Sequence, residues 1–190
     1  LDGHPINGFP LARLREKVCL VLQDPLLFAD SLGDNIAYDN PGRDPSEILE
    51  ITKAAALDDT VEGFPEGLDT ILGERGVTLS GGQKQRTALA RGLIRQSPIL
   101  ILDDCFSAVD TETEERILFG LKQMRKNSTT LLVSHRVSTA RHADRIMVLE
   151  HGEIKEIGTH NELLNLGGFY ANLELAQRNT EDKPKPRRLG

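Results

Sequence analysis

Residues 99–102 form a short apolar run that leads directly into two adjacent carboxylates, Asp103 and Asp104. No other feature constrains the fold of the chain as strongly. A run of this length and composition predicts a buried strand. Ligands of α/β proteins bind at the carboxyl ends of parallel strands, and carboxylates are ligands that Mg²⁺ accepts. The run therefore predicts an α/β protein with a phosphate or nucleotide site at this strand end.

A second motif, Leu79-Ser80-Gly81-Gly82-Gln83, opens a predicted helix about 20 residues before Asp103. Ser80 and Gln83 have the spacing of a capping box, so Ser80 is the expected N-cap. Each glycine costs a helix about 1 kcal/mol relative to alanine, which indicates that something approaches the backbone of Gly81 and Gly82 closely. A phosphate bound by the Ser80 hydroxyl and the Gly82 N–H fits this pattern. The alternative is an ordinary capped helix.

Polar residues also follow two other predicted strands. Gln23 ends an apolar run at residues 18–22, and His135 follows a run at 129–134. Parallel neighbouring strands would bring both to the edge that carries the acids. We expect Gln23 to act as a metal or water ligand and His135 to contact a γ-phosphate. The alternatives are a polar strand terminator and a structural histidine.

The order of predicted elements indicates an α/β protein with a parallel sheet covered by helices. Residues 25–97 carry almost no strand signal and predict an inserted α-helical subdomain. The catalytic core is expected at 1–24 and 98–165, and a disordered tail at 178–190. The predicted strands are 18–22, 99–102, 129–134 and 145–149, and the predicted helices are 30–38, 45–57, 110–126 and 138–142.

Composition excludes several classes of protein. The net charge of −6 argues against a nucleic-acid surface. The aromatic content of 4% and the absence of Trp argue against a carbohydrate or aromatic-cage binder. Cys19 and Cys105 lie far apart in apolar surroundings, which favours reduced thiols. No signal peptide is expected, and the longest apolar run is too short to span a bilayer.

These motifs together resemble the nucleotide-binding domain of an ABC transporter, over about residues 1–177. Gly73-Glu74-Arg75-Gly76 and residues 158–164 are similar to segments found in exporters. The motifs that match the family are the LSGGQ signature at residues 79–83, the Walker B strand at 99–103, the D-loop at 107–110, the switch histidine at His135 and the Q-loop glutamine at Gln23.

The resemblance implies ATP and Mg²⁺ as cofactors, with Asp103 and Gln23 at the metal. It implies catalytic roles for Asp104, His135 and Gln23. The expected partners are the transmembrane domain of the same transporter and a second nucleotide-binding domain, at the cytoplasmic face of the membrane. The residues that it assigns to nucleotide binding are Ser80, Gly81, Gly82, Gln83 and Asp110.

The first departure from the family is that the phosphate loop G-x-x-x-x-G-K-[ST] is absent, and no Gly-Lys pair occurs in the chain. Leu1-Asp2-Gly3 resembles the segment that follows the P-loop helix. The expected fold is therefore a P-loop NTPase-type core that lacks the P-loop strand.

The second departure is Asp104, because the family's general base is usually Glu. An aspartate carboxylate is withdrawn by roughly 1.5 Å, one C–C bond, and a misplacement of about 1 Å can cost on the order of 10²-fold in rate. This pattern resembles the weakly hydrolytic half of a heterodimeric multidrug exporter. The alternatives are a non-transporter ABC ATPase and a fragment with no nucleotide binding of its own.

Overall fold

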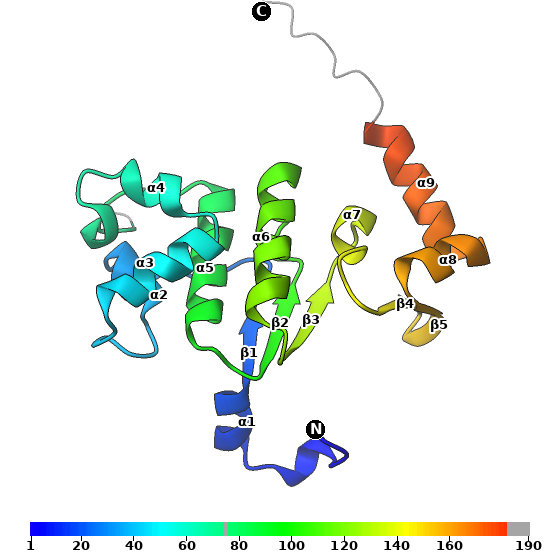
Figure 1. The fold of residues 1–190 in the computed structure, drawn as a ribbon. Helices are drawn as coiled ribbons and strands as arrows, with labels where there is room; N and C mark the ends of the chain where they lie inside the picture. The colour runs from blue at the N-terminus through cyan, green and yellow to red at the C-terminus, as the bar shows by residue number, and fades with distance from the viewer. Residues whose placement is uncertain (74–75, 182–190) are drawn as a thin grey trace, which may run out of the picture. The chain divides into compact units, whose positions relative to one another are not determined.

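A computed structural model of the protein describes residues 1–73 and 76–181 (Figure 1). The chain divides into two compact units, Leu1–Val133 and Ser134–Gly190. The elements of the first unit, in chain order, are η1 (Ile6–Gly8), α1 (Leu11–Lys17), β1 (Val18–Val21), α2 (Leu32–Ile36), α3 (Pro45–Ala54), α4 (Asp58–Glu62), η2 (Gly67–Asp69), α5 (Gly81–Ile94), β2 (Ile99–Asp103), α6 (Thr111–Met124) and β3 (Thr129–Val133).

The first unit is built on a three-stranded parallel sheet in the order β1-β2-β3. This confirms the three predicted strands and their parallel direction. In the register, Val21 lies opposite Leu102, and Asp103 lies opposite Val133. The three carboxyl ends therefore lie at one edge of the sheet, where the predicted site begins.

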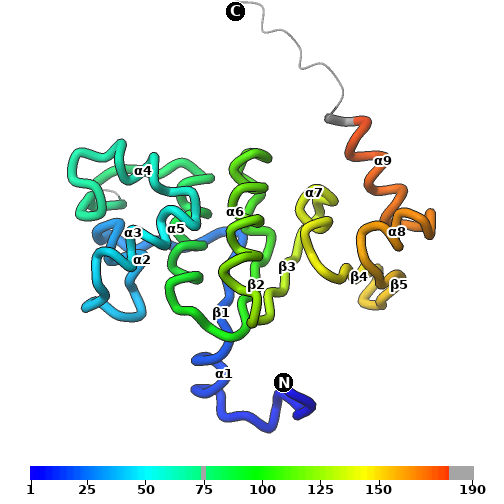
Figure 2. Tube along the Cα trace, viewed as in Figure 1, coloured from blue at the N-terminus to red at the C-terminus, as the bar shows by residue number. Residues whose placement is uncertain are grey.

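The helical section between β1 and β2 confirms the predicted insertion. The trace leaves β1, passes through α2 to α5 and returns to β2 (Figure 2). In the described residues of this section the only β pairings are two isolated bridges, Ser31 with Ile71 and Leu72 with Val77. Helix α3 ends before the predicted residue 57, because Ala56 has a φ of 53° and breaks the helix.

Helix α5 packs closely on the sheet. A Cβ atom on Gly92 would lie 2.6 Å from Cγ2 of Val21 in β1, so only glycine permits this approach. Helix α6, which connects β2 to β3, buries Ile117, Leu118 and Leu121. Both helices belong to the continuous apolar core of this unit, which includes the fully buried Leu100 and Leu102 of β2.

Strand β3 forms one edge of the sheet. Within the described residues it pairs only with β2. Leu131 and Val133 of β3 are 45% and 46% exposed, whereas Leu100 and Leu102 of β2 are fully buried. The open side of β3 agrees with the expectation of an incomplete sheet core.

The second unit contains a hairpin in place of the further parallel strand that was expected at 145–149. Strand β4 pairs antiparallel with β5 in a separate two-stranded sheet, so that expectation was wrong. The reason is the two-residue turn, in which His151 and Gly152 both have positive φ, at 51° and 81°. The elements of this unit are α7 (Val137–Ala140), β4 (Ile146–Glu150), β5 (Glu153–Gly158), α8 (His160–Leu166) and α9 (Phe169–Glu181).

A small core holds the second unit together. Val137, Ile146, Leu163 and Tyr170 are buried in one cluster. Helix α9 continues to Glu181, so residues 178–181 are helical instead of belonging to the predicted tail. The rest of that tail, and Glu74 and Arg75 of the predicted exporter segment, lie outside the described residues. Of the helices described, none has the length and apolar character needed to cross a membrane.

Candidate functional site

The two acids stand where the sequence predicted them. Asp103 is the last residue of β2, and Asp104 follows with a φ of 45°. Its N–H donates to the Val133 carbonyl at 2.9 Å, which ties the acid to the end of β3. Aspartate is one of the few non-glycine residues found readily in the left-handed region. The backbone therefore turns sharply after the strand and leaves both carboxylates partly exposed.

The predicted D-loop, residues 107–110, continues from this turn. Asp110 caps α6, since its Oδ1 accepts from the Thr113 N–H at 2.9 Å. This hydrogen bond lowers the pKa of the exposed Asp110 carboxyl. Cys105, between the acids and the loop, is buried, and burial raises the pKa of its thiol to about 12. The D-loop is therefore held at its end by the Asp110 cap of α6 and at its start by the buried Cys105.

The capping box predicted at the start of α5 is confirmed. The Ser80 Oγ accepts from the Gln83 N–H at 3.3 Å, and the Ser80 N–H donates to the Gln83 Oε1 at 2.9 Å. Gln83 is therefore occupied in holding the helix end. The cap uses one lone pair of the Ser80 hydroxyl, whose O–H can still donate to an anion.

The group that approaches Gly82 closely belongs to the chain itself and is the backbone of Ala108. A Cβ atom at Gly82 would lie 2.7 Å from the Ala108 carbonyl oxygen, and one at Gly81 would lie 3.3 Å from the Ala108 Cβ. The D-loop backbone is therefore the group that requires glycine at position 82, and the close approach needs no phosphate to explain it. The signature and the D-loop are in direct contact.

Gln85 joins three predicted motifs and was missed in the sequence. Its Nε2 donates to the Ser107 Oγ at 2.8 Å and to the Gln23 carbonyl at 3.1 Å, and its Oε1 accepts from the Ala108 N–H at 2.9 Å. The residue is only 5% exposed. A glutamine on the same face of α5 as the buried Ala88 and Leu89 was the signal in the sequence that pointed to it.

Gln23 lies two residues beyond β1, at the sheet edge that carries Asp103. Its main chain is held by Gln85, and the residue is exposed. In the described part of the chain no group of three or more His, Cys, Asp or Glu side chains could hold a metal. Mg²⁺ usually takes one or two carboxylates and completes its shell with water and phosphate oxygens. The assignment of Asp103 and Gln23 to Mg²⁺ remains a prediction.

His135 belongs to the second unit, two residues after the end of β3. Gln177 of α9 hydrogen-bonds the backbone around it, and the Arg136 N–H donates to the Ser134 Oγ at 3.1 Å. Its contact with a γ-phosphate remains a prediction.

An aromatic cluster follows Gln23. The rings of Phe28 and Tyr38 stack at 4.5 Å, and the Arg91 guanidinium lies 5.2 Å from the Phe28 ring centre. The buried Asn35 accepts from the Phe28 N–H at 2.9 Å and donates to its carbonyl at 3.0 Å. Of the two leucines that precede Phe28, Leu26 is largely exposed, whereas Leu27 packs against the core.

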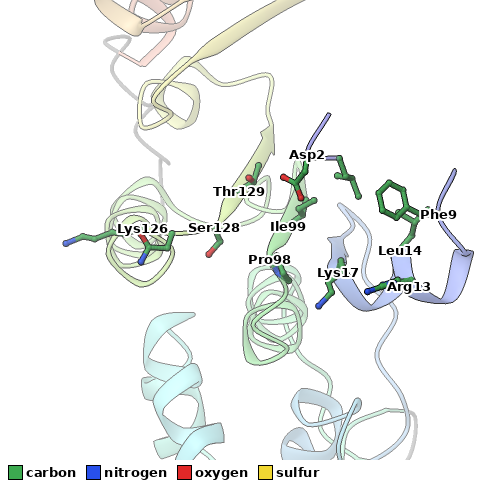
Figure 3. A pocket seen from close by; sticks show the side chains of 12 residues that line it. Asp2, Phe9, Arg13, Leu14, Lys17, Pro98, Ile99, Lys126, Ser128 and Thr129 are labelled. Carbon is green, nitrogen blue, oxygen red and sulfur yellow. The ribbon is translucent and has the colours of Figure 1, made fainter. Parts of the chain in front are cut away.

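A cavity of about 880 Å³ lies elsewhere in the first unit (Figure 3). It is lined by Pro98, Ile99 and Thr129 at the amino ends of β2 and β3, together with Arg13 and Lys17 of α1. This is the opposite end of the strands from Asp103 and Asp104. The cavity is therefore separate from the candidate site.

The family model for ABC transporters matches residues 1–107. The chain is similar to an ATP-dependent lipid A-core flippase of Albidiferax ferrireducens, with 48% identity over 180 residues, covering 93% of this chain and 31% of the flippase. It is also similar to YknU of Bacillus subtilis, an uncharacterized ABC transporter ATP-binding protein, with 43% identity over 191 residues, covering 100% of this chain and 33% of that protein.

Among solved structures, a bacterial Atm1-family ABC exporter with ATP bound matches with a TM-score of 0.87 and 41% identity, covering 93% of this chain and 31% of that one. The chain thus spans about a third of the length of the relatives it matches. The family match covers more than half of the chain and includes the signature helix, the strand that ends in Asp103 and the turn at Asp104. The chain belongs to the ABC transporter family.

Proposed function

We propose that the chain is part of the ATP-binding and ATP-hydrolysing module of an ABC exporter that powers substrate export across a membrane. Membership of the family supports this, as do relatives described as ATP-dependent flippases and as an exporter with ATP bound. The observation that carries the proposal is the Gln85 side chain, which links the signature helix, the D-loop and the end of β1 in one hydrogen-bonded network.

In this proposal the chain contributes to two nucleotide sites. At its own site, Asp103 and Gln23 hold Mg²⁺, which neutralises phosphate charge when bound. Asp104 orients the attacking water, and His135 contacts the γ-phosphate.

The partner site receives the start of α5 and the D-loop. The Ser80 hydroxyl and the N–H groups of the first helical turn face a phosphate that is held by a second nucleotide-binding domain, as at other helix N-termini that bind anions. The direct contact of Gly82 with Ala108 supports joint movement of signature and D-loop. The residues assigned to this face are Ser80, Gly81, Gly82, Gln83 and Asp110.

We propose further that this chain forms the weakly hydrolytic half of a heterodimer. Asp104 has a side chain one methylene shorter than Glu, and a general base acts only within hydrogen-bond reach of its water.

The proposed membrane partner is the transmembrane domain of the same transporter, at the cytoplasmic face of the membrane. Leu26, the stacked Phe28 and Tyr38 form a partly exposed apolar surface next to Gln23. Exposed apolar surface of this kind is typical of protein contacts. Because it lies next to Gln23, this surface is the proposed docking surface for the transmembrane domain.

The test is Asp104→Glu in the full-length transporter. We expect ATP hydrolysis at this chain's own site to rise by about tenfold or more, because the longer side chain restores the reach of the base. Steady-state ATPase rates should be measured with the partner's own catalytic base inactivated, so that only this site reports.

Asp103→Glu is the matched control, since it adds the same methylene at the metal-binding acid and should lower the rate. An unchanged rate in Asp104→Glu, with a melting temperature close to that of the parent protein, would contradict the assignment of Asp104 as a short general base.

A further inference from the structure

Gln177 makes two hydrogen bonds to the backbone on either side of Arg136. Its Oε1 accepts from the Val137 N–H at 2.8 Å, and its Nε2 donates to the His135 carbonyl at 2.8 Å. One side-chain amide thus satisfies a donor and an acceptor two residues apart. Only Asn and Gln side chains carry both groups on one rigid plane.

The first of these bonds supplies a cap that α7 does not have locally. The first N–H groups of a helix have no partner within it. Arg136, the N-cap residue, makes no side-chain capping bond, and α7 is only one turn long from Val137 to Ala140. A residue 40 positions later in the chain therefore fixes the start of this short helix.

Helix α9 is itself held in place. Tyr170, two turns before Gln177, is buried in the core of the second unit with Val137 and Leu163. Its hydroxyl lies 2.9 Å from Nδ1 of His160 in α8. Residues seven apart lie on the same face of a helix, so the packing that buries Tyr170 also directs Gln177 toward residues 135–137.

We infer that Gln177 is a positioning residue for His135. By holding the His135 carbonyl and the Val137 N–H, it sets the backbone from which the imidazole projects. This inference rests on the proposed contact between His135 and the γ-phosphate.

The experiment compares Gln177→Met and Gln177→Glu in the full-length transporter with the partner's own catalytic base inactivated, and kcat and KM for ATP are measured separately. Methionine matches the size of glutamine without either hydrogen bond, and we expect kcat to fall by about tenfold while KM changes less than about twofold. Glutamate keeps the acceptor for the Val137 N–H but loses the donor, so we expect an intermediate kcat. Asn172→Met, at an exposed position of the same helix, is the control and should leave both constants unchanged.

A double-mutant cycle with His135→Ala separates the two claims. If His135→Ala alone leaves kcat unchanged, the proposed role of His135 is wrong. If His135→Ala lowers kcat, Gln177→Met should add no further loss in that background. A full and additive loss, or no effect of Gln177→Met on kcat, would overturn the positioning role of Gln177.

Discussion

Both units fix a loop with the amide of a glutamine, but they support that glutamine differently. Gln85 is 5% exposed and belongs to a helix that packs against β1 within a large apolar core. Gln177 is half-buried on a helix held by a core cluster of four buried residues. A buried polar group left without a partner is costly, whereas a group near water recovers a partner from solvent. The D-loop is therefore held more rigidly than the segment that contains His135.

The largest effect is expected from Gln85→Met, which sharpens this comparison most directly. The substitution preserves volume but leaves the Ala108 N–H and the Gln23 carbonyl without their buried partner. We expect a loss of about 2–4 kcal/mol in the free energy of unfolding, measured by urea denaturation. Gln123→Met, at an exposed position of α6, is the control and should change stability by less than about 0.5 kcal/mol.

The same measurement on Gln177→Met provides the contrast. We expect a loss of about 1 kcal/mol, because water can replace part of both hydrogen bonds. If Gln177→Met destabilises the protein as much as Gln85→Met, the two loops are held equally and the comparison fails.

Gly82→Ala tests the contact between the signature and the D-loop and ranks next. Alanine favours the helix by about 1 kcal/mol, but its Cβ would lie 2.7 Å from the Ala108 oxygen and force the loop to move. Overpacking of this kind costs about 1–3 kcal/mol, so we expect a net loss of about 1 kcal/mol by thermal or urea unfolding.

Gly120→Ala is the matched control within α6. Nothing lies within 4 Å of the Cβ that it adds, so it should stabilise the protein by about 0.5–1 kcal/mol. A stabilising Gly82→Ala would contradict the close contact with Ala108.

The smallest effect concerns the loss of folding stability at low pH, to which one carboxyl in each unit contributes. Hydrogen bonds from backbone N–H groups lower the pKa of Asp110 in the first unit and of Glu162 in the second. A carboxyl whose pKa is depressed in the folded state stabilises the fold above its unfolded pKa of about 4. That contribution is lost as the pH falls through the folded value. Asp110→Asn and Glu162→Gln should therefore flatten the loss of stability below about pH 4.

Both side chains are exposed, so we expect each substitution to lower the melting temperature by only about 1 °C at pH 7, and by less at pH 3, where the parent carboxyl has lost part of its contribution. Differential scanning calorimetry at the two pH values measures this. A larger effect at pH 3 than at pH 7 would contradict the assignment of the loss of stability in acid to these carboxyls.

The sequence predicted the features that depend on near neighbours. The capping box uses Ser80 and Gln83, three residues apart, and the strand before Asp103 is an uninterrupted apolar run. The parallel direction of the three strands follows from the helical segments that connect them. The acids at the end of β2 were predicted for the same reason, since a strand end is a local property.

The features that sequence reasoning missed depend on contacts between distant residues. Gln85 bonds to Gln23, 62 positions away, and Gln177 bonds to Val137, 40 positions away. Neither spacing forms a motif. The apolar run of β4 also looks alike in a parallel sheet and in a hairpin, and only the left-handed φ of His151 in the turn distinguishes them.

The open side of β3 has a consequence for the behaviour of these residues in solution. The strand Thr129–Val133 is uncharged and rich in β-branched and leucine residues, and within the described chain one side of its backbone has no strand partner. An edge of this composition is a template on which further chains add as strands. We therefore expect the yield of soluble material on refolding to fall as the protein concentration rises, and a peptide that pairs with Thr129–Val133 to raise that yield.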